Sequence, residues 1–139
     1  MSDSVYLKAL TPEARSAIGG PYYQIVRFPF RVGRECRLGF WATNSDDARR
    51  KPNSIPNNDL YIFEPGTVFN VSREHFTIDI RGGAYVLMDR GSSCGTLVEG
   101  DHVGEKKKGG WRRLEDNDVI IVGSSESRYI FKFVVVRHS

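Results

Sequence analysis

The sequence has few of the residues that build disulfide frameworks, metal centres and membrane spans. Its 139 residues include two cysteines, Cys36 and Cys94, and three histidines. Two cysteines are too few for a disulfide-stapled scaffold, and no pair of histidines or cysteines has the spacing of a metal-binding motif. No apolar stretch approaches the roughly 20 residues that a membrane-spanning helix needs. We therefore expect no metal, no other cofactor and no membrane partner.

An excess of one charge is also missing. The chain has 20 Lys and Arg residues against 17 Asp and Glu residues, which gives a net charge of +3. This mild excess permits an acidic ligand but does not by itself indicate nucleic acid. Residues 1–4 lack the basic and then apolar pattern of a secretory signal. Together with the low cysteine content, this predicts a reducing, cytoplasmic setting.

Amphipathic helix patterns are absent as well, and short strand patterns take their place. Apolar and polar residues alternate from His75 to Ile80, as in a half-buried strand, and Gly82-Gly83 then predicts a tight hairpin turn. The expected strands span residues 5–10, 22–27, 30–34, 60–63, 75–80, 84–88, 96–98, the neighbourhood of 103, 111–114, 119–122 and 129–136. About 11 short strands with frequent turn signals favour an all-β sandwich of two antiparallel sheets.

Three further segments refine this expectation. Residues 129–136 are apolar on both faces, which predicts a strand inside a sheet. Residues 11–21 contain two prolines and a Gly-Gly pair, so we expect a connection there without a helix. Residues 39–58 are polar and lack periodicity, and we expect a long loop inserted into a single domain that covers residues 1–139.

Three short polar motifs lie where predicted strands begin or end. They are residues 33–34 (Gly-Arg), residues 72–75 (Ser-Arg-Glu-His) and residues 92–96 (Ser-Ser-Cys-Gly-Thr). Loops that a rigid sheet scaffold carries are frequent places for binding residues. Two of the motifs supply a guanidinium and two supply serine hydroxyls, and this combination of donors is suited to holding a phosphate.

Taken in order, the motifs resemble the forkhead-associated (FHA) domain, a family of phosphothreonine-binding modules. The family pattern also includes Asn-Asp and an aliphatic residue, here residues 58–60, and an Asp ahead of the third motif, here Asp89. A Leu-x-x-x-Asp segment that leads to an aliphatic strand and Gly follows, here residues 114–123. The resemblance covers most of the chain and implies a β-sandwich with its binding loops at one end. It also implies a non-catalytic signalling module whose partner is a phosphothreonine-containing substrate of a Ser/Thr kinase.

The resemblance assigns a role to individual residues. It implies that Arg34 grips the phosphate, that Ser72 and Ser93 add contacts to it, and that Arg73 lies along the peptide. The full set of phosphopeptide-binding residues is Arg34, Ser72, Arg73, Ser93, Cys94 and Gly95. The residues implied as structural support of the site are Gly33, His75 and Thr96.

The sequence departs from the family pattern at two places. The position of Cys94 normally holds an Asn that hydrogen-bonds the peptide backbone, and a thiol is a weak donor and acceptor. We therefore expect Cys94→Asn to tighten phosphopeptide binding. The loop at residues 39–58 is the second departure, because relatives have a much shorter connection there.

Other functions fit parts of the sequence. A degenerate FHA-like domain could mediate phosphate-independent association, and basic residues 49–51 and 106–108 could contact nucleic acid, although no aromatic residues are interleaved with them. Residues 91–95 match G-x-S-x-G, but a nucleophile elbow needs a helix where a strand is predicted. A nucleophilic Cys94 paired with His75 or His102 lacks a local base.

Overall fold

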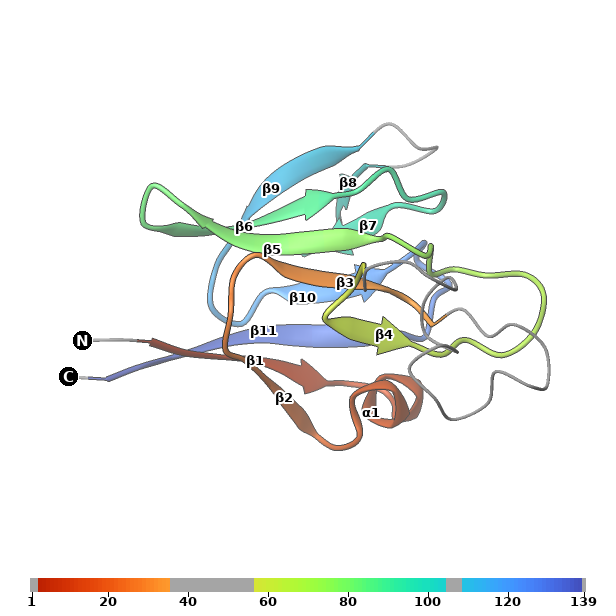
Figure 1. The fold of residues 1–139 in the computed structure, drawn as a ribbon, viewed down its shortest axis with the longest axis horizontal. Helices are drawn as coiled ribbons and strands as arrows, with labels where there is room; N and C mark the ends of the chain where they lie inside the picture. Colours follow the sequence, from red (N-terminus) through yellow and green to blue (C-terminus); the bar gives the residue numbers. More distant parts are fainter. Residues whose placement is uncertain (1–2, 36–56, 105–108, 139) are drawn as a thin grey trace.

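The computed structural model describes residues 3–35, 57–104 and 109–138, which form two packed β-sheets (Figure 1). The elements are β1 (Asp3–Ala9), α1 (Pro12–Ile18), β2 (Tyr22–Ile25), β3 (Phe30–Arg34), β4 (Leu60–Ile62), β5 (Phe76–Arg81), β6 (Ala84–Asp89), β7 (Thr96–Val98), β8 (Asp101–Val103), β9 (Gly110–Leu114), β10 (Val119–Val122) and β11 (Ile130–Arg137). The predicted all-β sandwich is confirmed. The predicted loop at residues 39–58 lies outside the described residues up to residue 56, as do the basic residues 49–51 and 106–108.

The strand order explains two features of the sequence. One sheet has the order β2-β1-β11-β10-β7-β8 and the other β4-β3-β5-β6-β9. Strand β11 lies inside its sheet, as the apolar character of both its faces predicted. The β3–β4 pair is parallel, with Val32 opposite Leu60, whereas only antiparallel pairs were expected. A parallel pair needs a long crossover connection, and residues 35–59 join these two strands.

The core lies between the inner faces of the two sheets. Most strands contribute alternate residues to it, because successive side chains of a strand point to opposite faces, whereas all three residues of β7 are buried. The largest fully buried side chains include Leu7, Phe76, Ile78, Leu87, Ile120, Phe131 and Phe133. The predicted hairpin is also confirmed, since β5 and β6 pair from Phe76↔Asp89 to Arg81↔Ala84 and leave Gly82-Gly83 as the turn.

The segment at residues 11–21 contains a helix that the sequence analysis did not expect. Helix α1 has seven residues, its N-cap Thr11 accepts the N–H of Ala14 at 3.1 Å, and it ends at Gly19 with a φ of 75°. A helix of two turns offers too few residues for a periodic pattern, so only the capping residues could have indicated it. Within the described ranges, no helix is long and apolar enough to span a membrane.

The loops between the strands separate into two ends of the sandwich (Figure 1). The end of β3, the β4–β5 connection and the β6–β7 connection lie together at one end, which we call the loop end. The two chain termini and the β5–β6 turn lie at the opposite end, which we call the terminal end. The three polar motifs therefore all belong to the loop end.

Candidate functional site

The three polar motifs meet directly at the loop end. The backbone N–H of Arg34, at the end of β3, donates to the carbonyl oxygen of Ser72 at 2.8 Å. The backbone N–H of Ser93 donates to the hydroxyl oxygen of Ser72 at 3.0 Å. Ser72 therefore links the first motif to the third, although 38 and 21 residues separate it from Arg34 and Ser93 in the sequence (72 − 34 and 93 − 72).

Gly33 lets the second motif lie against β3. A Cβ atom at Gly33 would be 1.9 Å from the carbonyl oxygen of Arg73, far inside any permitted contact. The same carbonyl oxygen accepts a hydrogen bond from the side-chain amide of Asn58 at 2.8 Å. The absence of a side chain at residue 33 is thus what brings the Ser72-Arg73 backbone within reach of Arg34.

His75 joins the second motif to the third from the buried side of the loops. Its side chain is fully buried, its Nδ1 accepts the N–H of Ser72 at 2.9 Å, and its Nε2 lies 2.7 Å from the carbonyl oxygen of Gly95. Because Nδ1 accepts, Nε2 carries the proton and donates to Gly95. Burial lowers the pKa of His75, which favours this neutral form. Both ring nitrogens are engaged, so His75 has no nitrogen left to act as a base for Cys94.

Asp89 fixes the β6–β7 connection. Its carboxylate accepts the backbone N–H groups of Gly91 and Ser92, both at 2.9 Å, and the Ser92 hydroxyl. The Ser92 hydroxyl oxygen accepts the N–H of Gly95 at 3.0 Å, and Gly95 has a φ of 77° that favours glycine. The buried Thr96 hydroxyl lies 3.5 Å from the same carboxylate. The connection is therefore held from inside, which leaves Ser93 exposed at its tip.

Two supporting residues were missing from the predicted site. Arg90 donates to the side-chain oxygen of Asn58 at 2.6 Å and to the carbonyl oxygen of Asn57 at 3.0 Å, and it pairs with Glu74 at 3.4 Å. Asn58 thus connects Arg90 to the carbonyl oxygen of Arg73. Asn58 belongs to the Asn-Asp pattern noted in the sequence and could have been assigned this role. Nothing in the sequence indicated Arg90.

The groups that remain at the surface suit an anionic ligand. Arg34 is partly buried, and its guanidinium carbon lies 3.8 Å from the ring centroid of Phe69. Arg73 is exposed, and its side chain forms no hydrogen bond or ion pair with the described residues. The Cys94 thiol is partly buried and donates weakly to the carbonyl oxygen of Phe69 at 3.8 Å. Two guanidinium groups and two hydroxyls thus come from loops that are joined to one another.

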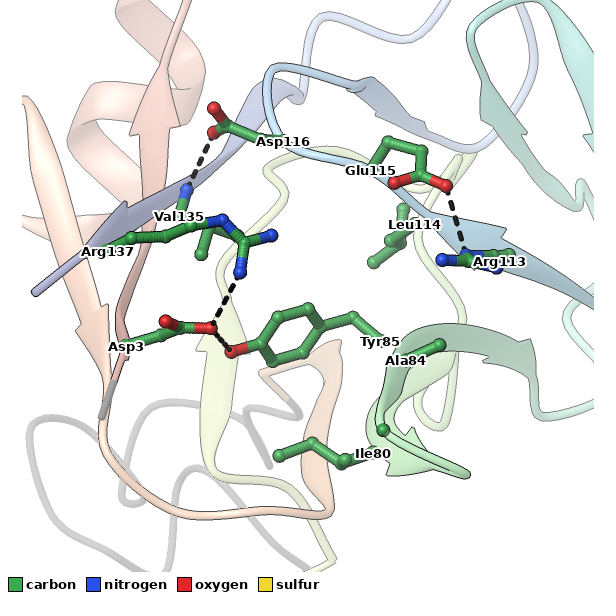
Figure 2. Close-up of a pocket in the computed structure, with 11 residues that line it drawn as sticks. Asp3, Ile80, Ala84, Tyr85, Arg113, Leu114, Glu115, Asp116, Val135 and Arg137 are labelled. Carbon is green, nitrogen blue, oxygen red and sulfur yellow. Dashed lines mark hydrogen bonds and ion pairs between the residues drawn. The ribbon is translucent and has the colours of Figure 1, made fainter. Parts of the chain in front are cut away.

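A pocket of about 250 Å³ lies at the terminal end (Figure 2). The Tyr85 hydroxyl donates to the Asp3 carboxylate at 3.0 Å, and Arg137 lies 3.6 Å from the same carboxylate. Asp116 accepts the backbone N–H of Val135 at 2.8 Å. The carboxylates of Asp3 and Asp116 and the Tyr85 hydroxyl therefore already have partners among the residues that line the pocket.

The structure also bears on the catalytic alternatives. The third motif is followed by strand β7, so it does not have the strand-to-helix turn of a nucleophile elbow. Within residues 3–35, 57–104 and 109–138, no group of three or more His, Cys, Asp or Glu residues is placed to hold a metal ion.

Comparison with known proteins gives a family match. The family model described as "FHA domain" matches residues 30–123, which include the three motifs, the whole five-stranded sheet and strands β7, β8 and β10 of the other sheet. The search of curated proteins gave no match.

Solved structures share the fold at low sequence identity. The kinase-interacting FHA domain of the kinase-associated protein phosphatase KAPP from Arabidopsis is 19% identical with a TM-score of 0.63, covering 100% of this chain and 99% of that one. Yeast splicing factor Pml1 is 23% identical with a TM-score of 0.65, and the match covers 98% of this chain and 82% of Pml1. Mycobacterium tuberculosis EmbR, in complex with a low-affinity phosphopeptide, is 21% identical with a TM-score of 0.59. The match covers 98% of this chain and 25% of EmbR, so this chain spans about a quarter of that protein.

Proposed function

Because the chain belongs to the FHA domain family, we propose that it binds phosphothreonine in a partner protein and catalyses no reaction. The observation that carries this proposal is the pair of hydrogen bonds that join Arg34 to Ser72 and Ser72 to Ser93. They bring together the three chain segments that carry one guanidinium and two hydroxyls. A single phosphate can contact donors gathered in this way.

The chemistry of the ligand matches these donors. A phosphothreonine carries a charge of about −1.5 to −2 at neutral pH and three acceptor oxygens. The planar guanidinium of Arg34 offers parallel N–H groups that fit two phosphate oxygens. The hydroxyl oxygen of Ser72 accepts from Ser93, so its O–H proton can still donate to the third oxygen. The family resemblance supports a role for the exposed Arg73 in contacting the peptide main chain.

The rigidity of the site contributes to affinity. His75 and Asp89 bind backbone groups of the motifs from inside the protein, so the loops have their shape before a ligand arrives. A preformed site avoids the entropy cost of ordering loops during binding. We propose that the partner is a substrate of a Ser/Thr kinase in the cytoplasm. The preference for phosphothreonine over phosphoserine rests on the family resemblance.

Titration with three matched peptides tests the proposal. A phosphothreonine peptide library, its phosphoserine counterpart and its unphosphorylated counterpart are titrated into the protein by fluorescence anisotropy. We expect the phosphothreonine library to bind most tightly and Arg34→Ala to weaken it at least tenfold, because hydrogen bonds to charged groups contribute about 1.5 to 3 kcal/mol.

Arg137→Ala is the matched control for this titration, because it removes an exposed guanidinium at the terminal end and should leave affinity unchanged. Binding that ignores the phosphate or survives Arg34→Ala contradicts the proposal. Strongly salt-dependent binding to generic DNA would instead favour the nucleic-acid alternative.

Phosphate-independent protein association is the second candidate function, and Cys94 favours it. The thiol contacts the carbonyl oxygen of Phe69 and cannot supply the paired donor and acceptor of an amide. If phosphothreonine reading is intact, Cys94→Asn should tighten phosphopeptide binding without creating binding to the unphosphorylated peptide. Equal binding of all three libraries by both proteins would support the second function.

A further inference from the structure

We propose that Phe69, on the β4–β5 connection, is a positioning residue that orients the Arg34 guanidinium for phosphate binding. This inference rests on the proposed function and adds to it a residue from outside the three motifs. The guanidinium carbon of Arg34 lies 3.8 Å from the centre of the Phe69 ring, well within the roughly 6 Å range of cation–π contacts. Such a distance corresponds to direct contact between the guanidinium and the ring.

Stacking of this kind is compatible with phosphate binding. The five N–H donors of a guanidinium lie in its plane, whereas the aromatic ring contacts one of its faces. Phe69 therefore uses none of the donors that a phosphate would need. An arginine side chain has many rotamers, and a ring against its face restricts them before the ligand arrives. Phe69 thus lowers the entropy that Arg34 loses on binding.

The backbone beside Phe69 is held firmly enough for this role. The buried carboxylate of Glu64 accepts the N–H groups of Asn70 and Val71, each at 2.9 Å. Gly123 packs so closely on this segment that a Cβ there would be 2.9 Å from the Cβ of Asn70. The residue that follows Phe69 is therefore fixed from two sides, and the ring has a stable base.

Phe69 is a large apolar side chain that is partly exposed to solvent, and its contact with Arg34 gives a reason for that position. Its side chain remains 38% exposed, while the adjacent Val68 is 89% exposed. The ring is thus only partly buried, and one of its faces lies against the Arg34 guanidinium. A ring in this place could also touch the peptide directly, and the test must separate these two roles.

Three variants separate the roles. Phe69→Leu keeps an apolar side chain but removes the aromatic face, Phe69→Tyr keeps the face, and Val68→Ala is the control for a change on the same connection. We expect Phe69→Leu to weaken binding of the phosphothreonine library about 3- to 10-fold, the range of an exposed to partly desolvated cation–π contact. Phe69→Tyr and Val68→Ala should stay within about twofold of the original protein.

A second measurement needs no ligand. The NMR order parameter of the Arg34 Nε–H group should fall in Phe69→Leu and be retained in Phe69→Tyr. Combining Phe69→Leu with Arg34→Lys tests whether residues 69 and 34 are energetically coupled in phosphopeptide binding, because a lysine lacks the planar group that stacks on the ring. In the Arg34→Lys background, Phe69→Leu should weaken binding less than it does with Arg34 present.

The outcomes distinguish this inference from the proposed function. An unchanged Arg34 order parameter in Phe69→Leu, or an equal loss of affinity with Arg34 and with Lys at residue 34, overturns the positioning role while phosphopeptide binding stands. Failure of the original protein to bind any phosphopeptide overturns the proposed function and the inference together.

Discussion

The loop end and the terminal end of the sandwich, which lie opposite each other in Figure 1, use different kinds of polar contact. At the loop end, buried His75 and Asp89 bind backbone groups of other residues, at distances of 2.7 to 2.9 Å. At the terminal end, Asp3 is paired with Tyr85 and Arg137, whose guanidinium side chain is 75% exposed. The first kind of contact sets the path of the chain. The second links side chains at the surface, and the exposed Asp116, which accepts the Val135 N–H, is an exception at the terminal end.

This difference concerns how firmly the polar contacts of each end hold the chain. The ion pairs beside the terminal pocket are exposed, and exposed ion pairs contribute only about 0 to 1 kcal/mol and are easily rearranged. The loop end has buried side chains whose loss would leave backbone groups without partners. Such a framework can present Arg34, Ser72 and Ser93 in one fixed arrangement. The comparison predicts that equal substitutions at the two ends will have unequal effects.

A methyl group added to a glycine should give the largest contrast. Gly33→Ala should destabilise the protein by about 3 kcal/mol, because the new Cβ would meet the Arg73 carbonyl oxygen at 1.9 Å. Gly83→Ala, at the terminal end, should cost only about 1 kcal/mol, since its Cβ meets nothing within 4 Å and only its φ of 79° opposes it. Urea denaturation of both variants measures the difference. Equal losses would show that the close approach at Gly33 is not decisive.

Removal of one carboxylate at each end should give the next largest contrast. Asp89→Asn should destabilise the protein by about 2 kcal/mol, because an amide cannot accept from Gly91, Ser92 and the Ser92 hydroxyl together. Asp3→Asn should cost no more than about 1 kcal/mol. Thermal unfolding, with phosphopeptide affinity as a second readout, tests this pair. A larger effect for Asp3→Asn would reverse the comparison.

Acidic pH should destabilise the folded protein, because it favours the protonated form of the buried His75. Burial lowers the pKa of the folded His75 below its ordinary value near 6.5, so the unfolded chain binds a proton more readily than the folded one. The stability contributed by neutral His75 is present above pH 6.5 and is lost as the pH falls below it, by at most about 1.4 kcal/mol per pH unit. An NMR titration of the His75 ring measures this directly. A midpoint at or above 6.5 in the folded protein would contradict the prediction.

The smallest effect is expected for an ion pair beside the terminal pocket. Arg113 and Glu115 lie 3.0 Å apart, but their side chains are 66% and 64% exposed. Arg113→Gln should therefore change the free energy of unfolding by less than about 0.5 kcal/mol, and added salt should reduce the difference further. Urea denaturation at low and high ionic strength provides the measurement. A loss comparable to that of Asp89→Asn would remove the distinction between the two ends.

Much of the fold could be predicted because strand patterns are local. The alternation from His75 to Ile80 and the Gly82-Gly83 turn located the β5–β6 hairpin, and the apolar run at residues 129–136 indicated a strand inside a sheet. Helix α1 was missed because seven residues give little periodicity. The parallel β3–β4 pair was missed because pairing depends on how residues far apart in the chain come together.

The sequence also indicated most of the candidate site and missed its support. Arg34, Ser72 and Ser93 were named from their motifs, and the structure brings them together. Arg90 and Phe69 lie outside the three motifs, and their positions in space connect them to the site. Their roles arise from contacts with Asn58 and Arg34, which are 32 and 35 residues away in the chain (90 − 58 and 69 − 34).

The sequence by itself determined the strand and turn pattern and the chemical identity of the donors in the three motifs. These properties depend on residue type and on neighbours within a few positions, because side-chain alternation and turn preferences are local. The tertiary structure decided which loops meet, which nitrogen of His75 carries the proton, and which ring lies against Arg34. Those features follow from the packing of two sheets, which brings distant backbone groups within hydrogen-bonding distance.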